Sequence, residues 1–280
     1  MEEFGVRLRR AMDTRGPLCV GIDPHASLLA RWGLPDTVDG LATFCRTVVS
    51  ALRERIAVCK PQSAFFERFG SAGIAVLETT IRTLRAGGAL VLLDAKRGDI
   101  GSTAQAYGQA YLNPASPLYV DAITVNVYPG VGSIAPILDE AEAHGGGVFV
   151  VALTSNPEGA QVQHARVSDG RTVAQLVLDE VARRNQRSRP MGSIGVVVGA
   201  TAGAADHDLT HLNGPILAPG MGAQGGTPED LRRVFAGVSR LVLPSYSRAI
   251  LSHGPSAPGL WNAASDTQAK CRNALEYPDL

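Results

Sequence analysis

The chain has 280 residues, of which 45% are hydrophobic and 19% charged, and its 26 basic and 26 acidic residues give a formal net charge of zero. This composition can fill one large core, and it excludes nucleic acid as the main partner because binding a polyanion needs a basic excess. No apolar run approaches the roughly 18 residues of a membrane span, and residues 1–15 lack the apolar stretch of a secretory signal. We therefore expect a soluble cytoplasmic protein.

The four cysteines show no metal-binding pattern. Cys19, Cys45, Cys59 and Cys271 share no ligand-like spacing, and two of them lie within apolar runs. We predict buried, reduced thiols, as is usual in a cytoplasmic protein. The six histidines are scattered too, so the sequence predicts neither a metal ion nor a cofactor.

Short β-rich apolar runs alternate with longer helical stretches along the chain. Helical periodicity is clearest at Leu41–Arg53, Gly73–Ala86 and Thr172–Arg184. Repeated strand–helix alternation indicates a parallel sheet with crossover helices. Eight such units favour a closed (β/α)8 TIM barrel over an open doubly wound sheet. The predicted strands are Leu18–Ile22, Ile56–Cys59, Ala89–Leu93, Ala122–Val125, Gly147–Leu153, Ser193–Val198, Pro215–Ala218 and Leu241–Pro244.

No linker divides the chain, so we predict a single domain over residues 1–280. A helix over residues 1–15 precedes a barrel at about 17–250, and a C-terminal helical tail covers 252–280. The segment Asn156–Arg171 is long and polar for the connection between a strand and a helix, and we expect a partly mobile loop there.

Charged residues gather at the ends of the second and third predicted strands, where this fold places its active site. Asp94 and Lys96 are two residues apart on one strand, so their side chains point to the same side. Lys60 ends the neighbouring strand, and the three groups can form an alternating chain of charges. An ammonium held against a carboxylate is a good proton donor to a carbanion. The alternative interpretation is a structural salt-bridge cluster.

A glycine-rich run follows the seventh predicted strand. Gly220–Gly226 can bring backbone N–H groups against an anion, and the next helix is expected to start at Thr227-Pro228-Glu229. Arg248, after the eighth strand, adds a cation with bidentate geometry. Phosphate binding after strands seven and eight is common in this fold. The alternative is a flexible loop beside a surface arginine.

Four residues near the strand ends have open roles. His25 is expected to shape a turn or cap a helix, and Arg97 to make a structural or interface contact. Glu67 fits either the rim of a site or a surface pair. Asn126 lies at the end of a predicted strand, and the sequence leaves open whether its side chain faces a substrate.

Several motifs together resemble one family. They are Gly21–Pro24, Lys60–Glu67, Leu93–Gly101, Leu153–Pro157 and the Pro-Gly-x-Gly-x-Gln-Gly-Gly run at Pro219–Gly226. Over residues of about 17 to 250 the chain resembles the orotidine 5′-phosphate decarboxylases, in particular their longer, mycobacterial-type bacterial branch. The Asp-x-Lys-x-x-Asp motif alone is shared with sugar-phosphate relatives, and the combination is what makes the resemblance specific.

The resemblance implies conversion of orotidine 5′-phosphate to uridine 5′-phosphate and CO2 in UMP biosynthesis, without metal or cofactor. Lys96 would protonate C6 of the pyrimidine, and Asp94 would lie beside the substrate carboxylate. Asp23 and Lys60 would bind the ribose hydroxyls.

The same resemblance implies contacts to the base and the phosphate. Ser155 matches a residue that hydrogen-bonds the pyrimidine edge. Gln224 and Arg248 match the phosphate ligands, with help from the backbone near Gly222 and near Tyr246 or Ser247.

The family also implies a homodimer with shared active sites. Asp99 lies beyond its strand, on the approach to the next helix, so its side chain need not face its own barrel. In the family this aspartate enters the partner's site, as does the threonine that matches Thr103.

Two other functions remain open at this point. One is a magnesium-dependent sugar-phosphate decarboxylase or aldolase of the same barrel group, such as a keto-gulonate-phosphate decarboxylase or a hexulose-phosphate synthase. The other is a phosphate-binding barrel without catalytic activity. Loss of orotidylate absorbance in the presence of a chelator would separate the first from the main prediction, and turnover itself would separate the second.

Overall fold

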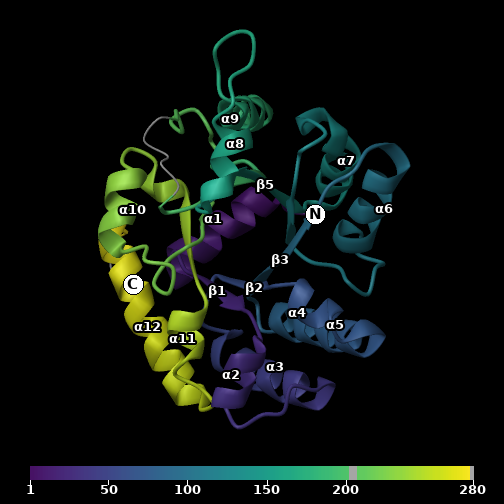
Figure 1. Ribbon diagram of the computed structural model, residues 1–280, viewed down its shortest axis with the longest axis vertical. Helices are drawn as coiled ribbons and strands as arrows, with labels where there is room; N and C mark the ends of the chain where they lie inside the picture. The colour runs from purple at the N-terminus through teal and green to yellow at the C-terminus, as the bar shows by residue number, and fades with distance from the viewer. Residues whose placement is uncertain (202–206, 278–280) are drawn as a thin grey trace.

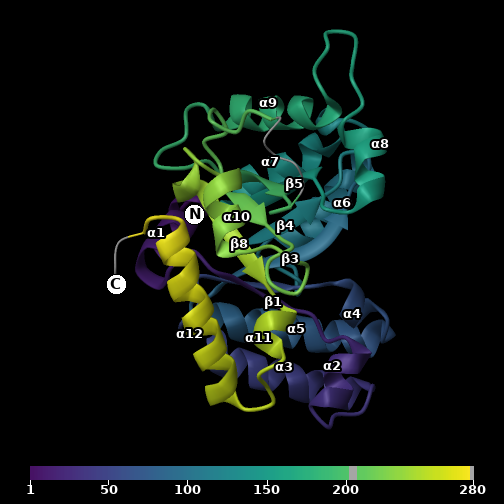
Figure 2. The same cartoon turned by 60° about the vertical axis from the view of Figure 1, so that its left-hand side comes forward.

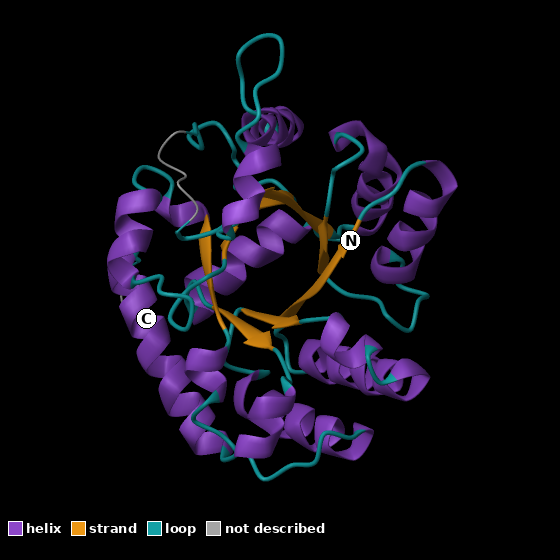
Figure 3. Cartoon of the chain, viewed as in Figure 1, coloured by secondary structure: helices purple, strands orange, loops and turns teal. Residues whose placement is uncertain are grey.

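The computed structural model describes residues 1–201 and 207–277. Eight strands form one closed parallel barrel in chain order, in which β1 pairs with both β2 and β8. Figure 3 shows this ring of strands with the helices around it. The (β/α)8 prediction is confirmed. The strands are β1 (Cys19–Ile22), β2 (Val58–Pro61), β3 (Leu90–Arg97), β4 (Ala122–Val125), β5 (Gly147–Leu153), β6 (Ile194–Val198), β7 (Ile216–Ala218) and β8 (Val242–Tyr246).

Helices lie at both ends of the chain and between successive strands, except that the described residues between β6 and β7 form no helix (Figure 1). The α-helices are α1 (Phe4–Arg15), α2 (Ala26–Arg31), α3 (Val38–Leu52), α4 (Ala64–Glu67), α5 (Gly70–Ala86), α6 (Gly101–Leu112), α7 (Ala135–His144), α8 (Ala160–Gln163), α9 (Val173–Asn185), α10 (Pro228–Val234), α11 (Arg248–Leu251) and α12 (Ala257–Ala274). Short 3-10 turns are η1 (Val131–Ile134), η2 (Pro157–Gly159) and η4 (Ser239–Leu241). Figure 2 shows α12 along the outside of the barrel, next to α10 and α11.

The strands are buried on both faces, which is why they are continuous apolar runs in the sequence. Every residue of β1, β2 and β4 is buried, as expected for parallel strands covered by helices on one side and by the barrel interior on the other. In β3 burial continues through Ala95 and ends at Lys96, where the strand reaches the mouth of the barrel. The apolar part of each strand therefore fills the core, and its polar end forms the mouth.

Helix α1 closes the opposite, N-terminal end of the barrel. Phe4 packs edge-to-face on Phe149 of β5, with ring centroids 6.0 Å apart. Arg7 of the same helix donates to Asp121, which precedes β4, and to the carbonyl of Gly145, which precedes β5. The barrel thus has one closed end, and its polar mouth lies at the other.

The segment between β5 and α9 differs from the loop predicted for Asn156–Arg171. It begins with the turn η2 and the short helix α8, and an antiparallel bridge joins Arg166 to Thr172. The segment is the connection between β5 and α9, as expected, and it contains more regular structure than a plain loop; Figure 1 shows its part between α8 and α9 as a hairpin that projects from the molecule. The side chains of this polar segment form hydrogen bonds and ion pairs with one another, and such contacts leave no recognisable pattern in the sequence.

All four cysteines are free and buried, as predicted. Burial raises the pKa of the Cys19 and Cys45 thiols to about 12, so they stay protonated and unreactive at neutral pH. Within the described part of the chain, no helix combines the length and the apolar composition needed to cross a bilayer.

Candidate active site

A pocket of about 500 Å³ opens at the carboxyl ends of the strands, a size typical of small-molecule sites. All eight strands or the residues that follow them contribute to its walls. The charged and polar side chains of its lining include Asp23, Lys60, Asp94, Lys96, Thr124, Ser155, Gln224, Ser247 and Arg248. Eight of the eleven site residues predicted from the sequence are thus placed in or beside one cavity or its glycine-rich loop, and the other three are Asp99, Thr103 and Asn126.

A chain of three charged side chains crosses the floor of this pocket. Lys60 Nζ lies 2.8 Å from Asp94 Oδ2, and Lys96 Nζ lies 2.5 Å from Asp94 Oδ1. Thr124 Oγ1 donates a further hydrogen bond to Asp94 Oδ1 at 2.9 Å. The predicted alternation of charges therefore exists, with the carboxylate between the two ammonium groups.

Burial and neighbouring charges shift the pKa values of Asp94 and Lys60 in opposite directions. Burial alone would raise the pKa of Asp94, but Lys60 and Lys96 lower it well below its usual range. Burial alone would lower the pKa of Lys60, and Asp94 and Asp23 raise it. The side chains of Lys60 and Asp94 are 7% and 9% exposed, whereas that of Lys96 is 47% exposed. Both lysines line the pocket, and Lys96 is the more exposed of the two.

The backbone of Lys96 has a conformation that is rare for a residue with a side chain. Its φ is 47°, and the pairing of β3 with β4 shifts register between Leu93 and Arg97. The Lys96 N–H donates to Thr124 Oγ1 at 3.0 Å, which helps to hold this conformation. Backbone strain of this kind concentrates at functional sites, where the surrounding structure maintains it.

Two buried oxygens just after the neighbouring strands β1 and β8 have no hydrogen-bond partner among the described residues. Asp23 Oδ1 and Ser247 Oγ are buried and form no hydrogen bond within residues 1–201 and 207–277. They lie close together, because a Cβ on Gly21 would approach both side chains, at 3.2 Å from Asp23 Oδ2 and 2.8 Å from Ser247 Cβ. Buried polar groups normally have partners, so this corner suits a ligand that carries hydroxyl groups. The sequence assigned Asp23 a role in ribose binding, whereas for Ser247 it implied only a place at the end of the eighth strand and backbone help at the phosphate.

The glycine-rich loop after β7 ends at a well-capped helix. Thr227 Oγ1 accepts from the Asp230 N–H, and Asp230 Oδ2 accepts from the Thr227 N–H at 3.0 Å. This capping box starts α10 where the sequence predicted. Gly220 and Gln224 line the pocket, whereas the Gly222 N–H donates to the carbonyl of Gly226 at 2.8 Å. In this conformation the Gly222 N–H is therefore engaged within the loop.

Arg248 is exposed at the pocket rim, at the first residue of α11. No carboxylate of the described residues pairs with it. An exposed guanidinium without a counter-charge, beside the glycine-rich loop, is suited to bind an anion.

Three predicted site residues lie outside the pocket of their own chain. Asp99 accepts from the Ile100 N–H, Thr103 is exposed on α6, and Asn126 is exposed and accepts from the Tyr128 N–H. Ile100 and Tyr128 are also 61% and 84% exposed. Asp99 and Thr103 are thus free to face another molecule, while Asn126 has no contact with the cavity.

The remaining open residues have local roles. Glu67 accepts from Ser63 Oγ at 2.5 Å and forms an ion pair with Arg97. His25 makes no side-chain cap to α2 and instead packs edge-on against Phe65, with ring centroids 4.3 Å apart. Both rings line the pocket. The sequence did not place this aromatic pair at the site.

The closed barrel, with its polar pocket at the carboxyl ends of the strands, has the arrangement typical of (β/α)8 barrel enzymes. Residues 16–257 match the model of the orotidine 5′-phosphate decarboxylase / HUMPS family, and the chain belongs to this family.

Relatives are similar over nearly the whole chain. An orotidine 5′-phosphate decarboxylase of Salinispora arenicola is 63% identical over 275 residues, which cover 98% of this chain and 99% of the relative. One of Streptomyces coelicolor is 58% identical over 276 residues, with 98% and 99% covered. A solved structure from Streptomyces avermitilis, described as the same enzyme, superposes with a TM-score of 0.96 at 57% identity and covers 99% of this chain and 97% of its own.

Proposed function

We propose that this protein decarboxylates orotidine 5′-phosphate, with Lys96 as the proton donor. The observation that carries the proposal is the half-exposed Lys96 ammonium, held 2.5 Å from a buried carboxylate inside a pocket of nucleotide size. The family and the names of the relatives support the same reaction.

The chemistry requires a cation at the reacting carbon. When the bond between C6 and the carboxylate breaks, its electron pair stays on C6 in an orbital that the ring π-system cannot delocalise. A pre-placed ammonium stabilises that charge without reorganising. In the proposed step a proton moves from Lys96 Nζ to C6 as CO2 leaves, and the neutral amine then regains a proton from solvent. Asp94 orients the ammonium, and the step needs neither metal nor cofactor.

The rest of the pocket is assigned to the parts of the nucleotide. Asp23 and Lys60 bind the ribose hydroxyls, and the unpartnered Asp23 Oδ1 supports this assignment. Ser155 binds the pyrimidine edge. The phosphate binds to Gln224 and Arg248, and the Gly222 N–H joins them if the loop rearranges. Phosphate contacts remote from C6 can drive loop closure and contribute to transition-state stabilisation.

We also propose a cytoplasmic homodimer with shared sites, acting in UMP biosynthesis. Asp99 and Thr103 lie outside their own pocket and would complete the pocket of the partner. The exposure of Thr103, Ile100 and Tyr128, with Asp99 partly exposed, supports an interface at this edge. Asn126 lies on the same edge, so a role for it in substrate binding would also require the partner.

Turnover of orotidine 5′-phosphate in a chelating buffer tests the function. We expect the ultraviolet absorbance of orotidylate to fall at the same rate with and without chelator, and uridine 5′-phosphate to form. Activity abolished by chelator would favour a magnesium-dependent sugar-phosphate relative. Binding of the nucleotide without any turnover would favour a barrel that is not an enzyme.

A further inference from the structure

We propose that Gln163 is a positioning residue that fixes the Ser155 wall of the pocket through Thr154. This inference rests on the proposed function, since Ser155 is the residue assigned there to the pyrimidine edge. Gln163 ends the short helix α8 and does not line the pocket itself. It acts on the residue that follows β5 directly.

The contact is a two-point clamp. Gln163 Oε1 accepts the Thr154 N–H at 2.9 Å, and Gln163 Nε2 donates to Thr154 Oγ1 at 2.8 Å. Both the backbone and the side chain of Thr154 are therefore held by one amide group. Ser155 comes next in the chain and lines the pocket, and its side chain forms no hydrogen bond within the described residues. The position of its hydroxyl thus depends on how its neighbours are held.

The clamp also sets the direction of a hydrogen-bond chain. A backbone N–H can only donate, so it fixes which end of the Gln163 amide faces Thr154. Nε2 must then donate to Thr154 Oγ1, which in turn donates to Asn156 Oδ1 at 2.6 Å. Asn156 Nδ2 donates to Glu158 Oε2 at 2.9 Å, where a carboxylate can only accept when ionised. Residues on both sides of Ser155 are therefore tied into one oriented chain.

A glycine makes room for the clamp. A Cβ on Gly159 would lie 2.7 Å from Thr154 Oγ1 and 3.1 Å from both Gln163 Nε2 and Oε1. Gly159 has an ordinary helical φ of −57°, so a side chain there would act through this clash and not through backbone strain.

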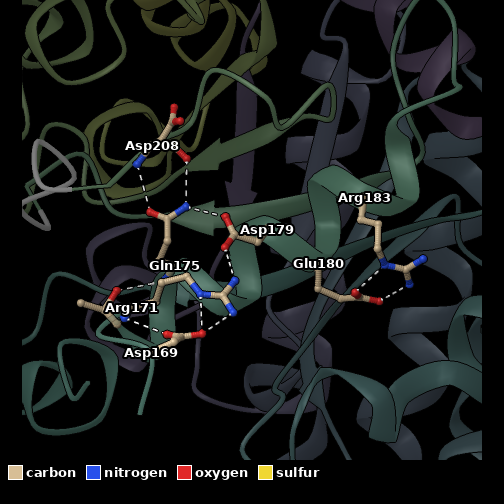
Figure 4. Close-up of polar contacts among 8 residues, drawn as sticks. Asp169, Arg171, Gln175, Asp179, Glu180, Arg183 and Asp208 are labelled. Atoms are coloured by element: carbon tan, nitrogen blue, oxygen red, sulfur yellow. Dashed lines mark hydrogen bonds and ion pairs between the residues drawn. The ribbon is translucent and has the colours of Figure 1, made fainter. Parts of the chain in front are cut away.

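The segment that carries Gln163 is itself anchored (Figure 4). Arg171 binds Asp169 and Asp179, and Gln175 binds Asp179 at 2.8 Å. Gln175 Oε1 also accepts the N–H of Asp208, beyond β6, at 3.0 Å. The hairpin is thus attached to α9, and α9 to the segment that follows β6; the Val173 N–H also donates to the carbonyl of Ala165, two residues beyond α8, at 2.9 Å.

The chain offers a matched control on the same helix. Gln161 is exposed and forms no side-chain hydrogen bond within residues 1–201 and 207–277. We expect Gln163→Ala to lower kcat/KM for orotidine 5′-phosphate about tenfold, the size expected for losing one hydrogen bond that shapes a site. Gln161→Ala should stay within about twofold of the unchanged protein.

A double-mutant cycle separates positioning from general stability. If Gln163 acts through Ser155, Gln163→Ala should lower kcat/KM by less than about twofold when Ser155→Ala is already present. Gly159→Ala should reproduce the effect of Gln163→Ala while leaving Gln163 in place. Gln163→Glu keeps the acceptor for the Thr154 N–H but loses the donor to Thr154 Oγ1. Its kcat/KM should therefore lie between that of the unchanged protein and that of Gln163→Ala.

Three results would overturn the inference: equal rates for Gln163→Ala and Gln161→Ala, an undiminished effect of Gln163→Ala in the Ser155→Ala background, or a Gly159→Ala protein with unchanged kcat/KM. Failure of the proposed function gives a different result, since the unchanged protein and Gln161→Ala would then also fail to turn over orotidine 5′-phosphate. If Gln163→Ala does not fold, the Gln163→Glu and Gly159→Ala rates still decide the question.

Discussion

Asp94 illustrates how one residue links folding to chemistry. Its carboxylate compensates the buried Lys60 ammonium and orients Lys96. Removal of one partner from a buried ion pair typically costs about 3–5 kcal/mol, because the other charge stays buried without compensation. We expect Asp94→Asn to lower the free energy of unfolding by about that amount at pH 7, measured by urea denaturation.

The pH dependence of this effect has a definite sign. Lys60 and Lys96 lower the folded-state pKa of Asp94 below its ordinary value of 3.8. Its contribution to stability is therefore present above that ordinary value and is lost as the pH falls through the lowered one. The stability difference between the unchanged protein and Asp94→Asn should shrink below a pH of about 4. A difference that stays constant from pH 7 to pH 2 would contradict this assignment.

The sequence located the charged residues of the site and, through the family motifs, Ser155 and Gln224, but it assigned no role to the side chains of Ser247 and Gln163. Spacing alone placed Asp94, Lys96 and Lys60 at one mouth, since strand periodicity and barrel geometry suffice for that prediction. Ser247 and Gln163 could not be found in this way. The unpartnered Ser247 oxygen appears only when the chain packs around Gly21, and Gln163 lies in a polar segment that resembles many loops.

At the scale of the element, the start of α10 connects the glycine-rich loop to the rest of the fold. The Thr227–Asp230 capping box fixes the residue that directly follows Gly226. Loss of such a cap costs about 1 kcal/mol. We expect Thr227→Ala to lower the free energy of unfolding by about that amount and to weaken uridine 5′-phosphate binding, measured by urea denaturation and by titration.

Thr227→Ser is the matched control, because serine keeps the hydroxyl that accepts from the Asp230 N–H. It should retain both stability and binding. Equal stability of Thr227→Ala and the unchanged protein would show that the cap contributes nothing to α10.

The strands were predictable because burial on both faces leaves continuous apolar runs. All eight predicted strands overlap an observed one. The third prediction ended at Leu93, whereas β3 continues to Arg97, since the polar residues of the mouth lack the apolar signal of a strand. The turn and short helix within Asn156–Arg171 were not predictable in this way, because polar contacts such as Gln163 to Thr154 hold them and leave no apolar pattern.

At the scale of the whole molecule, the account predicts sites shared between two subunits. Lys96→Ala and Asp99→Ala proteins should each be nearly inactive. After unfolding and refolding of an equal mixture, half of the pairs are mixed, and each mixed pair has one intact site of two. We therefore expect about one quarter of the unchanged activity to return.

The separate variants, refolded alone, are the controls for this mixing experiment. If Asp99 acted within its own subunit, every site in a mixed pair would lack one residue. No recovery of activity from a mixture shown to contain mixed dimers would then contradict the shared site.

The central claim is that the Lys96 ammonium donates the proton to C6. The most direct measurement compares orotidine 5′-phosphate turnover and uridine 5′-phosphate affinity for the unchanged protein and for Lys96→Ala. We expect turnover to fall by about 10³-fold or more, while the product still binds with an affinity within about tenfold of the original. Turnover by Lys96→Ala within about tenfold of the original rate would contradict it.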